Sequence, residues 1–135
     1  MSAITVPATT TRDSFLRFAL RLDAVISGLM GVVGVALAPW IAEQSGTTPA
    51  FEYTLSALFI AYGVAVVALS RRPSVRQTGV ACSIGNLVYT AASVIMVLAG
   101  VFPLTTTGIV ATLGSGVFTL VMADLQYIGL RRIRA

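Results

Sequence analysis

The chain alternates long uncharged, apolar stretches with short groups of charged and polar residues. Counted between charges, Ala24–Ala42 contains 19 uncharged residues, Tyr53–Ser70 contains 18 and Gln77–Ala123 contains 47. A helix needs about 20 apolar residues to cross a bilayer core of about 30 Å, so the first two stretches hold one span each and the third holds two. The pattern therefore predicts four transmembrane helices.

Proline residues mark the expected breaks between these helices. Pro39 is predicted to end the first span and Pro73 to follow the second, while Pro103 lies at the only break in the third stretch, where the turn must be tight. Loops this short make consecutive helices antiparallel neighbours. We predict an all-α membrane protein, an up-down four-helix transmembrane bundle forming a single domain over residues 12–134, with spans at about 22–41, 53–70, 80–101 and 105–130.

The region before the first span divides into two parts. Residues 1–11 are rich in Ser, Thr and Ala and lack a periodic apolar pattern, which predicts a disordered cytoplasmic tail. From Asp13 the pattern is helical, because Asp13, Arg17 and Arg21 recur every four residues on one stripe. Asp13 is placed to pair with Arg17. We expect this segment to lie at the membrane interface and to continue into the first span.

A cleaved signal peptide is the competing interpretation of the same region. A basic lead, an apolar run and the small residues Ala36-Leu37-Ala38 resemble the three regions of such a peptide. Pro39 would then follow the cleavage site, where a peptidase needs an accommodating extended backbone, and the apolar run is long enough to span. We therefore favour a membrane span.

The charged residues predict an orientation. The nine basic residues are all Arg and fall in three groups of three, before span one, between spans two and three, and after span four: Arg12, Arg17, Arg21, Arg71, Arg72, Arg76, Arg131, Arg132 and Arg134. The two opposite loops carry only Glu43 and Glu52. By the positive-inside rule, both termini are expected to be cytoplasmic in a multi-pass protein of the cell's inner (plasma) membrane.

Composition agrees with a membrane protein and limits its chemistry. Hydrophobic residues make up 56% of the chain and charged residues 10%, and the mean hydropathy is +0.90. Without His or Lys, and with Cys82 as the single thiol, the usual haem, zinc, triad and Schiff-base arrangements are excluded. We predict no catalytic residue, no metal ligand and no cofactor. The net charge of +4 is expected to face anionic lipid, with no nucleic-acid partner.

Small and polar residues form a stripe along the first span. Asp23, Ser27, Gly31, Gly34 and Ala38 follow one another at spacings of 4, 4, 3 and 4, which places them within a narrow arc of a helix. Small residues allow another backbone to approach closely. We interpret Gly31 and Gly34 as helix-packing residues, and a ligand groove is the alternative.

Spans three and four also carry polar groups. Asn86 and Tyr89 share an arc of span three, and an Asn in hydrocarbon needs a partner, so this arc should face the interior. In span four, Asp124 lies opposite a small and polar face that contains Thr119 and Gln126. Because a carboxylate is costly to leave against lipid, the Asp124 side is expected to touch protein, unless the side chain snorkels to the Arg-rich interface.

At 1.5 Å per residue these groups belong to the cytoplasmic half of the bundle. The candidate intramembrane polar cluster is therefore Asp23, Ser27, Asn86, Tyr89 and Asp124. One alternative is a cavity open to the cytoplasm. The favoured alternative is a structural cluster in which these groups bond one another and neighbouring arginines such as Arg21.

Several short motifs resemble a known family. Arg21-Leu22-Asp23-Ala24-Val25, Ser27-Gly28, Tyr62-Gly63 and Ser70-Arg71-Arg72-Pro73 are similar to segments of the small four-span integral membrane proteins of actinobacteria. The resemblance covers about residues 17–132 and implies a four-helix membrane fold. That family has no established activity, so the resemblance implies no site residue.

Two functional hypotheses follow. The first is a non-enzymatic membrane component, either an accessory subunit or a binder of lipid or another hydrophobic molecule. The alternative is a small ion-coupled transporter that uses Asp124, the only acid placed deep in a span. The expected partners are the lipid bilayer and either another membrane protein or further copies of this chain.

Overall fold

The computed structural model describes residues 12–134, and within them the chain forms four α-helices and no strand. The helices are α2 (Ser14–Ser45), α3 (Pro49–Leu69), α4 (Arg76–Ala99) and α5 (Thr106–Arg134). All four are long and apolar enough to cross a membrane. The predicted all-α four-helix bundle is confirmed, and the predicted tail at residues 1–11 lies outside the described residues.

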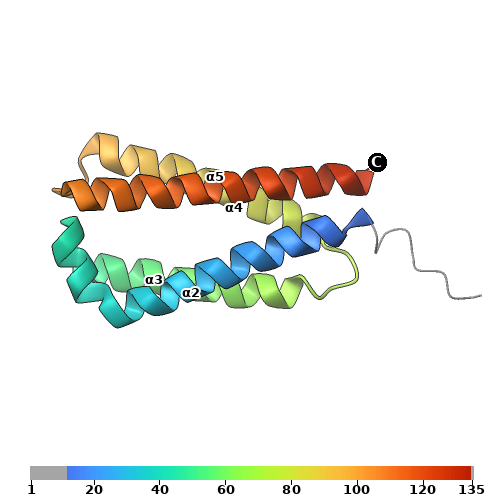
Figure 1. Cartoon of the computed structure of the whole chain (residues 1–135), viewed down its shortest axis with the longest axis horizontal. Coiled ribbons are helices and arrows are strands. Elements are labelled where there is room, and N and C mark those ends of the chain that lie inside the picture. The colour runs from blue at the N-terminus through green and yellow to red at the C-terminus, as the bar shows by residue number, and fades with distance from the viewer. Residues whose placement is uncertain (1–11, 135) are drawn as a thin grey trace, which may run out of the picture.

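The helices form two hairpins. Figure 1 shows α2 beside α3 in one layer and α5 with α4 in the other, and the packing is closest within these two pairs. The hairpins are joined mainly where α2 packs on α5. The backbones of α3 and α4 stay further apart, and these helices meet through side chains such as Phe59 and Tyr89, whose ring centroids are 5.7 Å apart.

Glycine residues set how closely α2 and α3 approach. A Cβ atom added to Gly63 would lie 2.6 Å from the carbonyl oxygen of Ala24, and one added to Gly31 would lie 2.6 Å from the carbonyl oxygen of Ser56. A Cβ on Gly34 would overlap the Ser56 hydroxyl. The structure thus places Gly31 and Gly34 directly against α3, in the helix-packing position that small residues permit.

The seam between α2 and α5 is held by contacts near both ends of the helices. Near the Arg-rich end, Gly129 lies against Leu16, and a Cβ added there would be 2.8 Å from the Leu16 Cα. Near the opposite end, Gly108 lies against the carbonyl group of Ser45, which also accepts a hydrogen bond from the Thr105 amide at 3.1 Å. The two hairpins are therefore fixed to each other at both ends of the seam.

The first span is longer than predicted, because α2 continues through Pro39 to Ser45. The prediction that the helix stops at Pro39 was wrong. A proline inside a helix removes one backbone hydrogen bond and bends the axis without necessarily ending the helix. Figure 1 shows the bend in the last part of α2, which then ends at Gly46 in the left-handed conformation, with φ of 82°.

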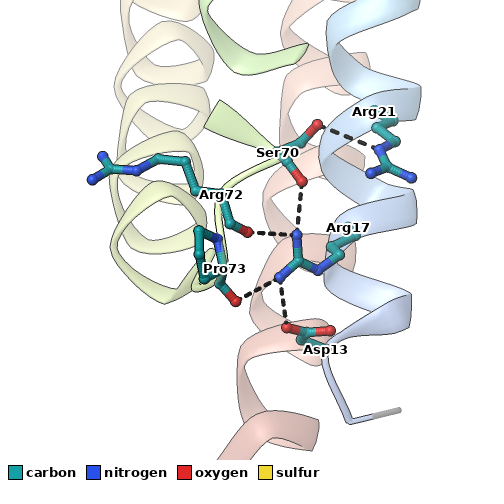
Figure 2. A network of polar contacts seen from close by, with 6 residues as sticks. All are labelled: Asp13, Arg17, Arg21, Ser70, Arg72 and Pro73. Atoms are coloured by element: carbon teal, nitrogen blue, oxygen red, sulfur yellow. Dashed lines mark hydrogen bonds and ion pairs between the residues drawn. The ribbon is translucent and has the colours of Figure 1, made fainter. Parts of the chain in front are cut away.

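Arginine fixes the turn between α3 and α4. The Arg17 guanidinium donates to the carbonyl oxygens of Ser70 (2.9 Å), Arg72 (2.7 Å) and Pro73 (2.8 Å), and to the Asp13 carboxylate at 3.0 Å (Figure 2). Helix ends leave carbonyl groups without intrahelical partners, and a basic side chain satisfies them. The predicted pairing of Asp13 with Arg17 is present.

The outer surface of the bundle is apolar. Leu98 of α4 is 81% exposed, Val64 of α3 is 68% exposed and Val110 of α5 is 65% exposed. Side chains of this kind lose little when they face lipid and would be unfavourable against water. Together with helix length, this surface indicates a small multi-pass membrane protein.

Candidate functional site

A single buried carboxylate connects all four helices. Asp23 of α2 is 0% exposed, and its Oδ2 atom accepts hydrogen bonds from the Tyr62 hydroxyl (2.6 Å), the Asn86 amide (2.9 Å) and the Gln126 amide (2.8 Å). Its Oδ1 atom accepts from the Ser27 hydroxyl at 3.2 Å. We call these five residues the Asp23 network. Its members come from α2, α3, α4 and α5.

The network is ordered by a bond between two of its amides. The Asn86 amide that donates to Asp23 also donates to the Gln126 side-chain carbonyl at 3.1 Å. Asn86 is 6% exposed and Gln126 is 0% exposed, so both amides are buried. Satisfied polar networks of this kind fix the relative position of helices, because any shift leaves a buried donor unpaired.

No cation balances this carboxylate among the described residues. The one ion pair in that part of the chain joins Arg17 to Asp13, and Arg21 donates to the Ser70 hydroxyl at 3.3 Å instead of to Asp23. The predicted bonding of the cluster to Arg21 was therefore wrong. A buried carboxylate is costly without compensation, and here four neutral donors supply it.

The structure brings together three of the five residues predicted for the polar cluster: Asp23, Ser27 and Asn86. Tyr89 lies near them but outside the Asp23 network. Its hydroxyl is 2.9 Å from the Ser115 hydroxyl of α5. Tyr89 therefore bonds to α5 and contributes one wall of the cavity described below.

Asp124 does not belong to the cluster, and the expectation that its side of α5 packs on protein was wrong. Asp124 is exposed, whereas Gln126 and Thr119 face the interior at 0% and 7% exposure. The opposite face of α5 packs against the bundle because it carries both the Gln126 amide that donates to Asp23 and the small residues that let α2 approach closely. Asp124 shares an outer stripe of α5 with Tyr127 and Arg131, toward the Arg-rich end.

Two members of the network were not singled out from the sequence. Tyr62 lies in the apolar second span, and Gln126 was placed on the polar face of span four without being assigned to the cluster. Axial depth was an available signal, because Tyr62 lies eight residues before Ser70 and Gln126 five before Arg131. At 1.5 Å per residue, both donors lie within about 12 Å of the Arg-rich end, like Asn86.

A cavity lies between the two hairpins beside the Asp23 network. Its larger part has a volume of about 690 Å³, is partly open to the outside of the bundle, and includes residues from all four helices. A second part of about 380 Å³ adjoins it toward the other end of the bundle. The two parts share six lining residues: Met30, Leu55, Phe59, Tyr89, Ala111 and Ser115.

The cavity lining is mostly apolar, with polar groups at both ends and the Tyr89–Ser115 pair between them. Ser27, Tyr62 and Asn86 line the larger part, so three of the four donors to Asp23 form its wall. At the far end, the smaller part includes Glu52, whose carboxylate accepts a hydrogen bond from Thr47. Apolar pockets of several hundred Å³ with a few convergent polar groups are typical small-molecule sites.

The described residues contain no group of three acidic, Cys or His side chains that could hold a metal ion, and Cys82 is buried as a free thiol. In comparisons with known proteins, no family model, no curated protein and no solved structure matches this chain.

Proposed function

We propose that this chain is a non-enzymatic integral membrane protein that binds a hydrophobic molecule, such as a lipid chain, in the cavity between its hairpins. The observation that carries the proposal is the apolar cavity of about 690 Å³, which extends by an adjoining part toward the far end of the bundle. The volume falls within the range of about 300 to 1,000 Å³ seen in ligand pockets.

The surrounding structure supports a preformed site. The Asp23 network and the contacts at both ends of the α2–α5 seam fix the hairpins without filling the space between them. Phe59, Leu55 and Met30 provide an apolar wall, while the Tyr62 hydroxyl and the Asn86 amide lie where a polar end group of the ligand would meet them. This arrangement favours a binder of a hydrophobic molecule over an accessory subunit.

Cavity filling tests the proposal. Gly114 lines the larger part, and a Cβ atom added there has no neighbour within 4 Å, so Gly114→Phe places a ring in open space. We expect the purified variant to carry less co-purified lipid than the parent, as counted by native mass spectrometry. Val110→Phe is the matched control, because Val110 is 65% exposed on the same helix and does not line the cavity.

Two results would contradict ligand binding in the cavity. One is an equal amount of bound lipid in Gly114→Phe and the parent. The other is an equal loss in Gly114→Phe and Val110→Phe, which would show that a bulky ring anywhere on α5 disturbs the protein. Melting temperatures of both variants in the same detergent show whether the fold is retained.

A small ion-coupled transporter is the second candidate, and the buried Asp23 favours it. A titratable carboxylate inside a span, with no cation bonded to it in the described chain, is a feature of proton-coupled sites. Asp23 takes the role first given to Asp124, because Asp124 lies on the outer face while three of the donors to Asp23 line the cavity.

Proteoliposome flux separates this candidate from the binder. In a transporter, Asp23→Asn abolishes proton-linked flux of a hydrophobic cation such as tetraphenylphosphonium while the parent protein carries it. A parent protein that moves neither the cation nor protons contradicts the transport candidate. The lipid-binding measurement on Gly114→Phe is independent of this result.

We also propose that the protein lies in the plasma membrane with both termini and the turn between α3 and α4 in the cytoplasm. The arginines of the described chain lie at one end of the bundle, where α2 starts, α3 meets α4 and α5 ends (Figure 1). Reporter fusions at Ala135 and within residues 46–49 test this orientation. An external reporter at Ala135 would contradict it.

A further inference from the structure

We infer that the Arg-rich end of the α4–α5 hairpin carries a second site, which binds the headgroup and upper acyl chain of an anionic phospholipid. A groove of about 260 Å³ lies between the start of α4 and the end of α5. Arg76 and Arg131 contribute to its lining, and Val80, Ile84, Tyr127 and Leu130 provide apolar surface. This site is separate from the central cavity, with which it shares no lining residue.

The two arginines of the groove have no anionic partner among the described residues. Arg17 is engaged by backbone carbonyls and Asp13, and Arg132 lies over the Phe15 ring at 4.4 Å. Within the described residues, Arg76 and Arg131 make no ion pair and no side-chain hydrogen bond. An anionic partner is therefore the natural counter-charge for this pair.

Local structure holds this positive charge at the groove. The Arg131 guanidinium lies 5.9 Å from the centroid of the Tyr127 ring one turn earlier, within the range of a cation–π contact. Arg76 is the first residue of α4, whose first turn contains no acidic residue, so the positive end of the helix dipole adds to its charge. On α5 the nearest acid in sequence, Asp124, is two turns away.

The apolar wall identifies the anion as a lipid. Val80 and Ile84 lie on successive turns of α4 and are 39% and 57% exposed, so they extend from Arg76 toward the middle of the membrane. A free phosphate ion gains nothing from this surface, whereas an acyl chain covers it while its phosphate meets the arginines. Basic pockets between transmembrane helices near the membrane surface bind anionic headgroups in this way.

Native mass spectrometry of the full chain with equimolar phosphatidylglycerol and phosphatidylcholine of identical acyl chains tests the site. We expect about a thirtyfold preference for phosphatidylglycerol, which corresponds to roughly 1 kcal/mol for each of the two arginines near the membrane surface. The double variant Arg76→Gln with Arg131→Gln should lose this preference. The matched control, Arg71→Gln with Arg72→Gln, removes the same charge from the same end, outside the groove, and should keep it.

A third variant tests the apolar wall without changing charge. Val80→Trp fills the groove beside both arginines and should reduce bound phosphatidylglycerol, and melting curves confirm that each variant is folded. Equal loss of preference in the two double variants would overturn the proposal in favour of general surface charge. An unchanged preference in the groove variant, or displacement of the lipid by excess inorganic phosphate, would overturn it as well.

Discussion

Arg17 and Asp23 lie six residues apart on α2, and each side chain has four hydrogen-bond partners. The two networks differ in their exposure to solvent. Arg17 donates to three backbone carbonyls and to Asp13 at the end of the bundle, and its side chain is 19% exposed. Asp23 accepts from four neutral side chains and is 0% exposed.

The difference lies in what replaces a lost partner. At the Arg17 site, the bonds to the Arg72 and Pro73 carbonyls are exposed, so water can hydrate these carbonyls when they lose their donor, and the net contribution of each bond is small. Asp23 is fully buried, and a donor that loses the carboxylate has no other acceptor assigned to it in the described structure, apart from the Asn86 amide, which also bonds Gln126. Networks with equal numbers of bonds should therefore differ severalfold in their effect on stability.

Removal of the Asp23 carboxylate should have the largest effect. Asp23→Ala leaves the Tyr62 hydroxyl and the Asn86 and Gln126 amides without their shared acceptor, and we expect a loss of about 3 to 5 kcal/mol in the free energy of unfolding. Denaturation by SDS in a mild detergent measures it. Asp124→Ala is the control and should change stability by less than about 0.5 kcal/mol. Similar losses of stability in the two variants would show that the burial of Asp23 does not determine its contribution.

Close packing beside the network should have the next effect. Gly63→Ala places a methyl group against the Ala24 carbonyl and pushes α3, with Tyr62, away from Asp23. We expect a loss of about 1 to 3 kcal/mol, typical of overpacking. Gly85→Ala, whose Cβ has no neighbour within 4 Å, should leave stability unchanged or raise it by up to about 1 kcal/mol. Equal effects of the two variants in the same denaturation assay would show that α2 and α3 are not closely packed at Gly63.

Deletion of a single donor sharpens the comparison. Tyr62→Phe removes one bond to the carboxylate and keeps the ring, so a loss of about 1 to 2 kcal/mol is expected. Tyr89→Phe removes a bond to the neutral Ser115 hydroxyl and should cost about 0.5 kcal/mol. The thermal unfolding of both variants, measured side by side, reports the difference. A larger loss for Tyr89→Phe would reverse the ranking.

The smallest effect is expected at the surface network. Arg17→Gln should lower the free energy of unfolding by about 1 kcal/mol, because water can hydrate the exposed Arg72 and Pro73 carbonyls, although Ser70 and Asp13 are buried. Arg71→Gln is the control, since no partner of Arg71's side chain is found in the described residues. A loss at Arg17 as large as that at Asp23 would mean that solvent access does not separate the two networks.

The axial arrangement of the chain could be predicted from the sequence, because charges and prolines divide it into spans. The start of α3 at Pro49, the end of α4 at Ala99 and the start of α5 at Thr106 lie within a few residues of the expected bounds. The predicted helix end at Pro39 was wrong because a proline is compatible with both a helix end and a bend within a helix. The choice depends on later contacts, such as Ser45 against Gly108.

The candidate site was predictable only in part, because helical rise gives the depth of a residue but not the direction of its side chain. The high cost of a polar group in hydrocarbon predicts that Asn86 faces the interior, and the stripe of small residues that Asp23 shares with Gly31 and Gly34 predicts the same for Asp23. The same argument failed for Asp124, since the rotation of α5 follows from close contacts such as Gly129 against Leu16. The sequence of a single span does not specify these contacts with helices that are distant along the chain.

The α2–α5 seam also has a consequence for biosynthesis. Asp23 and Gln126 are separated by 103 positions, and Leu16 meets Gly129, so the seam forms between the earliest and the latest of the four helices to leave the ribosome. During translation, the Asp23 carboxylate lacks the Gln126 donor until α5 is inserted into the membrane. Chains arrested before α5 should therefore be recognised and degraded faster than chains arrested just after it, which makes completion of this seam a checkpoint in assembly.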